Sequence, residues 1–238
     1  MAIGPAHSFY NYLRATREPF YSFLISLPLI FSYELLIFLL NHSDVTGLRN
    51  GADIIFRQLF SIFDVYGFYA VGLVLIIIFL FSYYFYERSG REIRFRFYYF
   101  PLAVAESSIY AGILFLIFSE IADFDISLGL NAKQNFVLIL GAGVYEEFIF
   151  RVILITGFNF FLTQILRLGK AGSYFLSVVA SSFVFSLFHY LGVYGEAFIL
   201  KTFVLRFLSG VYLSGVYLFR GYGLAAYTHS IYDIMVFI

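Results

Sequence analysis

The sequence predicts an all-α membrane protein, a single bundle of transmembrane helices. The chain of 238 residues is 61% hydrophobic and only 13% charged, with a mean hydropathy of +0.87, whereas soluble domains are about 45–50% apolar. Its apolar residues also gather in runs of about 20, the length that crosses a bilayer as a helix. Because no polar stretch is long enough for a soluble domain, residues 1–238 are expected to form one integral membrane domain.

Each expected transmembrane helix follows from one apolar run. The runs predict about seven such helices, near residues 20–40, 66–86, 97–119, 136–162, 173–191, 197–219 and 222–238. The second run carries no charge, whereas the last is short and contains His229 and Asp233. Between the first two runs, residues 53–64 repeat apolar side chains at helical spacing among charges. This pattern is typical of an interfacial helix, or of part of an eighth membrane helix.

The basic residues of the short connections predict the orientation. The first residues of the chain are too polar for the core of a signal peptide, so we expect them to belong to the mature protein. Acidic residues dominate 120–133, whereas the connection after the second run is basic, with Arg88, Arg91, Arg94 and Arg96. Since basic loops stay in the cytoplasm, this connection is expected there. Seven helices then place the N-terminus inside and the C-terminus outside.

Composition and missing motifs exclude several kinds of chemistry. The 15 basic and 15 acidic residues cancel, so nothing indicates a nucleic-acid partner. The sequence has no cysteine, which removes disulfides, thiol nucleophiles and thiolate metal sites. It also lacks the HExxH pattern of helical zinc sites and the GxGD and GxSG patterns of other intramembrane proteases. We expect no cofactor.

A cluster of charges interrupts the fourth run, at residues 143–151 with the sequence GVYEEFIFR. Charges inside a bilayer cost a few kcal/mol or more each, so they usually pair or mark a functional site. Glu147 and Arg151 lie four residues apart on one helix face, where they can pair, while Glu146 points about 100° away. We therefore expect Glu147 to be structural and Glu146 to act as a general base for water. Alternatively, all three line a polar seam and fix the register of the helix.

Two further clusters lie on other predicted helices. His189 is near the end of the fifth, with Phe185 and Ser182 earlier on nearly the same face. His229 and Asp233 are four residues apart on the last, where the carboxylate can orient the imidazole. Each cluster alone also fits an interfacial histidine or a simple helix staple. Three such clusters on three helices favour one shared site.

The three clusters resemble the CPBP family of intramembrane proteases. EEFIFR fits its pattern EExxxR, FSLFH fits FxxxH and HSIYD fits HxxxN/D, in the same order, and the resemblance covers about residues 134–238. The family comprises the CAAX prenyl endopeptidases and the bacteriocin-processing or immunity proteins. The resemblance implies an all-helical bundle, usually of about eight helices, that encloses a polar cavity within the membrane, and the count of about seven runs falls one short of it. It also implies a membrane-associated protein or peptide as the substrate, with the lipid bilayer as the other partner.

The resemblance assigns roles to six residues: Glu146, Glu147, Arg151, His189, His229 and Asp233. Glu146 and His189 would activate water. His229 would stabilise the oxyanion, with Asp233 orienting it. Glu147 and Arg151 would shape the site by pairing. Carboxylates and imidazoles also suit zinc, so a metal-dependent hydrolase is the mechanistic alternative, although the resemblance favours a metal-free site.

The same polar residues also fit other functions. A non-proteolytic binding or immunity protein, or a small transporter, uses the same kinds of residue, although no inverted repeat favours transport. A prokaryotic cytoplasmic membrane is the expected location.

Among the remaining polar residues, Lys201 is expected to extend to the interface and Arg206 to pair with Glu106 or line the cavity. Gly210 and Ser214 are expected to allow close helix packing.

Overall fold

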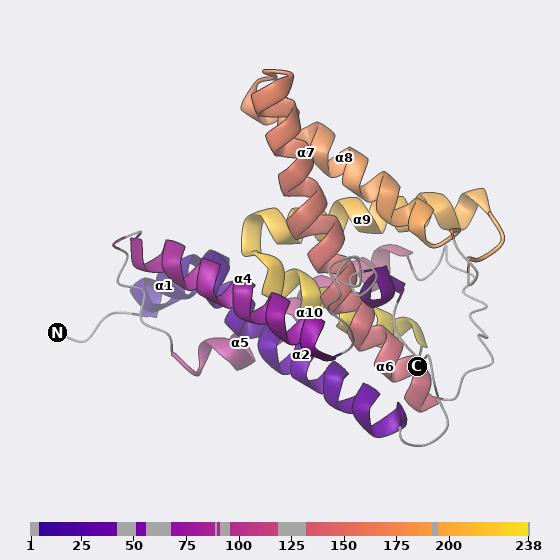
Figure 1. Cartoon of the computed structure of the whole chain (residues 1–238), viewed down its shortest axis with the longest axis horizontal. Coiled ribbons are helices and arrows are strands. Elements are labelled where there is room, and N and C mark those ends of the chain that lie inside the picture. The colour runs from indigo at the N-terminus through magenta and orange to yellow at the C-terminus, as the bar shows by residue number, and fades with distance from the viewer. Residues whose placement is uncertain are drawn as a thin grey trace.

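The computed structural model of the chain describes residues 5–41, 51–55, 68–88, 90, 96–118, 132–191 and 195–237, and most of these residues are in helices. Within these ranges every regular element is a helix, and the helices pack as a bundle (Figure 1). The predicted all-α fold is therefore confirmed. Most of the predicted interfacial segment 53–64, most of the acidic connection 120–133, and Arg91 and Arg94 lie outside the described residues.

Every predicted membrane run contains helix. The α-helices are α1 (Pro5–Arg17), α2 (Pro19–Asn41), α4 (Phe68–Arg88), α5 (Tyr99–Phe118), α6 (Ala132–Gly141), α7 (Thr156–Phe160), α8 (Lys170–Phe188), α9 (Leu200–Arg220) and α10 (Tyr222–Phe237). Three π-helical stretches follow α6 or α7: η1 (Ala142–Glu146), η2 (Phe148–Ile155) and η3 (Phe161–Ile165). The predicted run 136–162 is thus a series of joined α- and π-helical stretches.

Within the described residues, four helices are long and apolar enough to cross a membrane: α2 over Pro19–Leu39, α5, α8 and α9. The predicted run 222–238 becomes α10, which has 16 residues and is shorter than the roughly 20 needed to span a bilayer alone. The predicted run 66–86 becomes α4, whose side chains are described only in part. These apolar helices make the chain an integral membrane protein.

The polar N-terminal stretch forms a helix, α1, that hydropathy does not indicate. Pro5 occupies its first position, where a missing N–H costs nothing. Arg14 and Arg17 lie in its last turn, where cations favour the helix dipole. Tyr12 and Thr16, one turn apart, are buried against the bundle. A one-turn repeat of this kind is the sequence signal that identifies an amphipathic helix.

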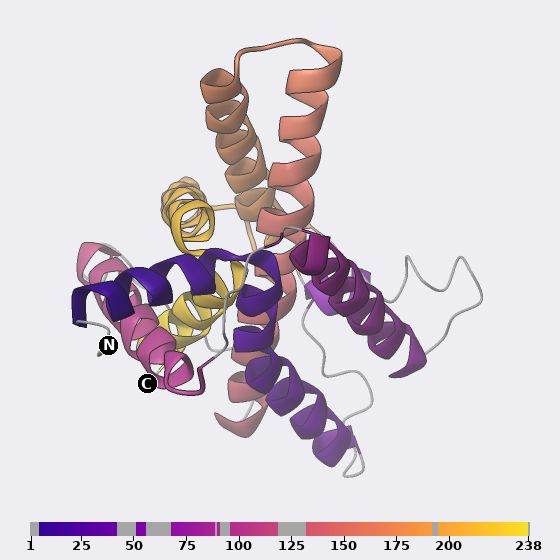
Figure 2. The same cartoon turned by 90° about the vertical axis from the view of Figure 1, so that its left-hand side faces the viewer.

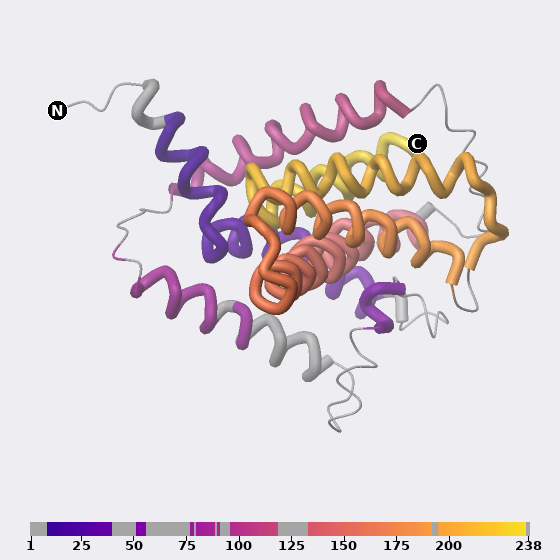
Figure 3. Tube along the Cα trace, turned by 90° about the horizontal axis from the view of Figure 1, so that it is seen from above, coloured from indigo at the N-terminus to yellow at the C-terminus, as the bar shows by residue number. Residues whose placement is uncertain are grey.

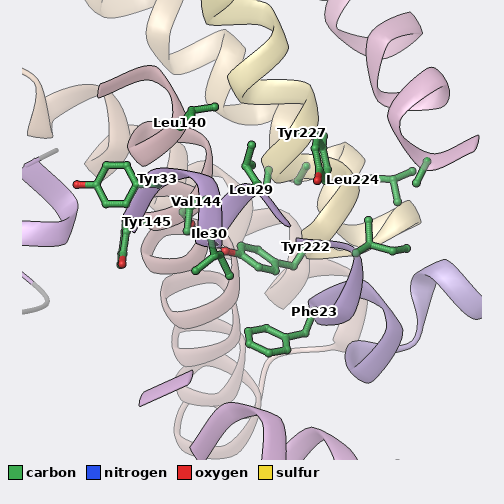
Figure 4. Close-up of a cluster of buried hydrophobic side chains, with 14 of the residues drawn as sticks. Phe23, Leu29, Ile30, Tyr33, Leu140, Val144, Tyr145, Tyr222, Leu224 and Tyr227 are labelled. Atoms are coloured by element: carbon green, nitrogen blue, oxygen red, sulfur yellow. Dashed lines mark hydrogen bonds between the residues drawn. The ribbon is translucent and has the colours of Figure 1, made fainter. Parts of the chain in front are cut away.

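The last helix, α10, lies within the bundle, where it contacts α2, α5, α9 and η1. Figure 4 shows Leu29 and Ile30 of α2 and Val144 of η1 packed near Tyr222 and Leu224 of α10. By contrast, α7 and α8 form a hairpin that projects from the rest of the bundle (Figure 2). The position of α10 brings its polar residues beside the charged stretch of η1 and η2.

A tight turn at Gly221 joins α9 to α10. Its φ of 89° is a conformation that glycine adopts without steric cost. A Cβ there would also lie 2.6 Å from Oγ of Ser22, which is too close for a real side chain. This turn therefore requires glycine on two counts, and it sets where α10 begins.

Candidate active site

The predicted glutamates lie at the junction of two π-helical stretches. Glu146 ends η1, and Glu147 separates it from η2, which contains Arg151. Turns of π-helix are rare and often occur at functional sites, because the wider turn displaces side chains from their α-helical positions. The separation of about 100° expected for consecutive residues of an α-helix therefore does not describe this stretch. No sequence pattern indicates a π-turn, so its position could not be predicted.

Glu147 and Arg151 form the predicted ion pair. Nη1 of Arg151 lies 2.9 Å from Oε1 of Glu147, and the two side chains are 1% and 0% exposed. The guanidinium also donates to the Gly210 carbonyl, with 3.4 Å between Nη2 and the oxygen. Its Cζ atom lies 4.4 Å from the centre of the Phe185 ring, a cation–π contact. Arg151 therefore ties its own helix to both α8 and α9.

Glu147 has a second partner that the sequence did not predict. Its Oε1 atom also lies 2.7 Å from Nδ1 of His229, so one carboxylate oxygen bridges the arginine and the histidine. On the far side of the ring, Nε2 of His229 lies 3.5 Å from Oδ2 of Asp233, as their spacing on one helix face predicted. His229 is thus held between two carboxylates, and Glu147 joins the first predicted cluster to the third.

A close approach of η1 and α10 makes this contact possible. A Cβ on Gly143 would clash with Oγ of Ser230 and would lie 2.6 Å from the carbonyl oxygen of Ala226. Only glycine allows the two backbones to come this near. Since Gly143 lies four residues before Glu147 and Ser230 follows His229, the glycine sets the separation of these two site residues. An isolated glycine in an apolar helix is the sequence signal that could have indicated it.

His189 follows the last residue of α8, and its ring is fixed by that helix. Nδ1 lies 3.0 Å from the carbonyl oxygen of Phe185. Because a carbonyl only accepts, Nδ1 carries the hydrogen, and Nε2 of the neutral ring keeps a lone pair. The Phe185 ring makes edge contacts with His189 at 5.1 Å and with His229 at 5.9 Å between centroids. Phe185 therefore contacts both histidines as well as Arg151, a role that the sequence did not reveal.

Glu146 is buried, with 5% of its surface exposed. Its charge acts electrostatically on His189, His229 and Asp233, as well as on Arg151. The structure thus brings the six predicted residues into one cluster, from the stretch 142–155, from α10 and, for His189, from the position just after α8. Within the described residues, no three His, Asp or Glu side chains are grouped closely enough to hold a metal ion.

Residues 130–235 match the family model of the type II CAAX prenyl endopeptidase Rce1-like proteins. The resemblance to CAAX endopeptidases is confirmed. The Rce1-like segment includes α6 through most of α10 and contains all six predicted site residues. Rce1-like proteins are proteases, so the match supports an enzyme of that class in this membrane protein. No curated protein and no solved structure matches the chain.

The predicted partner of Arg206 is wrong. Its guanidinium binds both carboxylate oxygens of Glu196 through Nη2, at 2.7 and 2.9 Å. Glu196 lies just before α9, so the arginine reaches a residue of the α8–α9 connection instead of Glu106 in α5. The expected close packing at Gly210 is confirmed, since a Cβ there would lie 3.3 Å from Cα of Ser182. Ser214 donates to the Gly210 carbonyl one turn earlier.

Glu106 forms a second polar cluster, at the other end of α9. Its carboxylate pairs with Arg220, with 2.9 Å between Oε2 and Nη2, and accepts hydrogen bonds from Tyr12 and Tyr110. Burial and the hydrogen bond to this carboxylate raise the pKa of Tyr12 above its ordinary value, so the phenol remains a donor. Arg220 also donates to the Leu13 carbonyl at 3.0 Å. These bonds hold α1 against α5 and α9.

Proposed function

We propose that this protein is an intramembrane endopeptidase that hydrolyses a peptide bond of a membrane-associated protein with a glutamate-activated water. The observation that carries the proposal is the bridge made by Glu147, which holds Arg151 and His229 through one oxygen. Through it, two of the three sequence patterns of the family meet in a buried cluster. The third pattern joins them through the Phe185 ring.

In the proposed mechanism, Glu146 and His189 activate the water. The Nε2 lone pair of His189, fixed by the bond from Nδ1 to the Phe185 carbonyl, and the Glu146 carboxylate are the two acceptors for its proton. The resulting hydroxide forms a bond to the carbonyl carbon of the substrate, and the π electron pair of the C=O bond moves to the carbonyl oxygen. When the tetrahedral intermediate collapses, the same proton passes to the leaving amine nitrogen. Base and acid are then one pair of residues, restored at the end of each cycle.

His229 stabilises the oxyanion in this proposal. The carboxylates of Glu147 and Asp233 flank the two ring nitrogens of His229. Because each carboxylate accepts a hydrogen bond, both nitrogens carry a hydrogen, and we assign His229 as an imidazolium. The contact from Nε2 to Asp233 is long, at 3.5 Å, so this N–H is the one that turns to the developing oxyanion. Glu147 and Arg151 keep the ring in place from the other side. A donor preset in a site with little water stabilises negative charge most effectively.

Cleavage by the purified protein tests the proposal. The full chain is reconstituted in liposomes with a membrane-anchored peptide, and the products are identified by mass spectrometry. Cleavage at one internal bond, with incorporation of one oxygen from labelled water, is expected. Binding of peptides without any cleavage would refute the protease and favour a binding or immunity protein.

A further inference from the structure

One face of α9 carries a second arginine toward the site. The carbonyl of Gly210, in α9, accepts the hydrogen bond from Arg151, and a Cβ on this glycine would lie 3.1 Å from Cδ1 of Phe185. Arg206 lies one turn earlier in α9, and residues four apart share one face of an α-helix. The face of α9 that contacts Arg151 therefore also presents Arg206.

Contacts on both sides place Arg206 between α8 and α10, which each pack against α9 (Figure 3). On the α8 side, its Cζ atom lies 5.5 Å from the centre of the Tyr190 ring, and Tyr190 directly follows His189. On the α10 side, the preceding residue of α9 lies in one apolar cluster with Tyr232. The guanidinium acts electrostatically on both His189 and Asp233. Arg206 thus belongs to the site, although none of the three sequence patterns includes it.

The guanidinium of Arg206 uses only part of its hydrogen-bonding capacity. Both oxygens of Glu196 bond to the same nitrogen, Nη2, at 2.7 and 2.9 Å. In the strongest pairs of this kind, two nitrogens of the arginine each bind one carboxylate oxygen. Nη1 of Arg206 is buried and has no hydrogen-bond partner within the described part of the chain. The arginine therefore keeps a donor that a second acceptor can use.

Glu196 is a partner that can be exchanged. It lies in the connection between α8 and α9, outside both membrane helices. The connection is also held without the ion pair, because the backbone N–H of Glu196 donates to the His189 carbonyl at 3.0 Å and the hydroxyls of Tyr190 and Thr202 are bonded at 2.9 Å. The side chain of Glu196 can therefore leave Arg206 while its backbone stays in place.

The other two cations of the cluster are not exchangeable in this way. Arg151 pairs with the completely buried Glu147, and loss of this pair would separate contacts that hold three helices together. His229 has a carboxylate beside each ring nitrogen, from Glu147 and Asp233. An anionic group that enters the site therefore meets Arg206 as the cation with a donor to spare.

We infer that Arg206 binds a carboxylate of the substrate, which replaces the side chain of Glu196 and bonds to both Nη1 and Nη2. The inference rests on the proposed function and narrows its substrate class to membrane-associated peptides with a carboxylate close to the cleaved bond. This carboxylate is either an acidic side chain or the C-terminus of the peptide. Arginine suits the role because its planar fork matches the two oxygens of a carboxylate.

Peptide binding tests this inference independently of cleavage. One fluorescent, membrane-anchored peptide is made with a free C-terminal carboxylate, with a C-terminal amide, and with an amide plus one internal glutamate. Each is titrated by fluorescence anisotropy with the full chain in nanodiscs, carrying Glu146→Gln to prevent cleavage. At least one carboxylate version should bind about tenfold or more tightly than the plain amide, and the tighter version identifies the source of the carboxylate. Equal affinity for all three would overturn the inference.

Arg206→Gln and Glu196→Gln are matched variants, because each removes one charge of the same ion pair. Arg206→Gln should weaken binding of the carboxylate peptide about tenfold or more and hardly affect the amide, and Arg206→Lys should recover part of the loss. Glu196→Gln should bind the carboxylate peptide at least as tightly as before, since it removes the competing carboxylate. Equal losses in the two glutamine variants would mean that the pair only holds the connection, and would overturn the inference.

Cleavage kinetics separate binding from the reaction. With Glu146 intact, Arg206→Gln should raise the KM of the carboxylate peptide by more than it lowers kcat. A loss confined to kcat would assign Arg206 to the chemical step and overturn its role in substrate binding. Binding that depends on the carboxylate and on Arg206, without cleavage of any version, would instead refute the proposed protease and leave the binding site standing.

Discussion

Replacement of Arg151 by alanine should destabilise the protein strongly. Glu147 is completely buried, and its Oε1 atom contacts both Arg151 and His229. The substitution removes the guanidinium, so only His229 remains beside this buried carboxylate. The change also removes the cation–π contact with Phe185 and the bond to the Gly210 carbonyl. Removing one partner of a buried ion pair lowers stability by about 3–5 kcal/mol. Arg151→Ala should therefore lower the free energy of unfolding by this amount and reduce peptide cleavage.

Arg206→Ala is the matched control. This arginine also pairs with a glutamate, but Glu196 is 43% exposed and can be hydrated when its partner is lost. Pairs of this kind contribute about 0–1 kcal/mol. Unfolding midpoints in one detergent, with folded yield from size-exclusion chromatography, compare the two variants. An Arg151→Ala protein as stable as Arg206→Ala would refute the structural role of Arg151.

Three further predictions concern the rest of the site. Gly143→Ala should push η1 away from α10 at Ser230, which should cost about 1–3 kcal/mol of stability and lower the unfolding midpoint. The control is Gly157→Ala, which should leave the midpoint unchanged because its new Cβ meets nothing within 4 Å. Equal midpoints for the two variants would contradict the close packing at Gly143. His189→Ala should reduce turnover by about 10²-fold or more with little loss of stability. Its effect on turnover should be strongly non-additive with that of Glu146→Gln, and additive effects would contradict a shared water. A strong chelator should leave turnover unchanged, whereas stoichiometric zinc with chelator-sensitive cleavage would favour the metal-dependent alternative.

Contacts within one helix could be predicted from the sequence. Glu147 with Arg151, and His229 with Asp233, are four residues apart, and that spacing places side chains on one helix face whatever surrounds the helix. The helices themselves follow from apolar runs of nearly membrane length. The basic residues around Arg88 also predict which end of the bundle faces the cytoplasm, and this orientation stays a prediction.

Contacts between helices could not be predicted in the same way. The bond from Glu147 to His229 depends on how closely η1 approaches α10 at Gly143, which only the packed structure defines. Arg206 was expected to pair with Glu106 or to line the cavity. In the structure Glu106 pairs with Arg220 instead, because the position of each charge along its helix determines which charges meet. The helix α1 was missed for a different reason, because its buried stripe is narrow and its composition is polar.

Substitution of Glu146 by glutamine tests the central claim most directly. Glutamine keeps the size of the side chain but cannot take a proton from water, so turnover of a membrane-anchored peptide should fall by about 10²-fold or more. The unfolding midpoint should stay near that of the unmodified protein. Glu147→Gln, the matched control one residue away, should lose both activity and stability because it weakens the bonds to Arg151 and His229. Full turnover by the Glu146→Gln protein would contradict the glutamate-activated water on which the account rests.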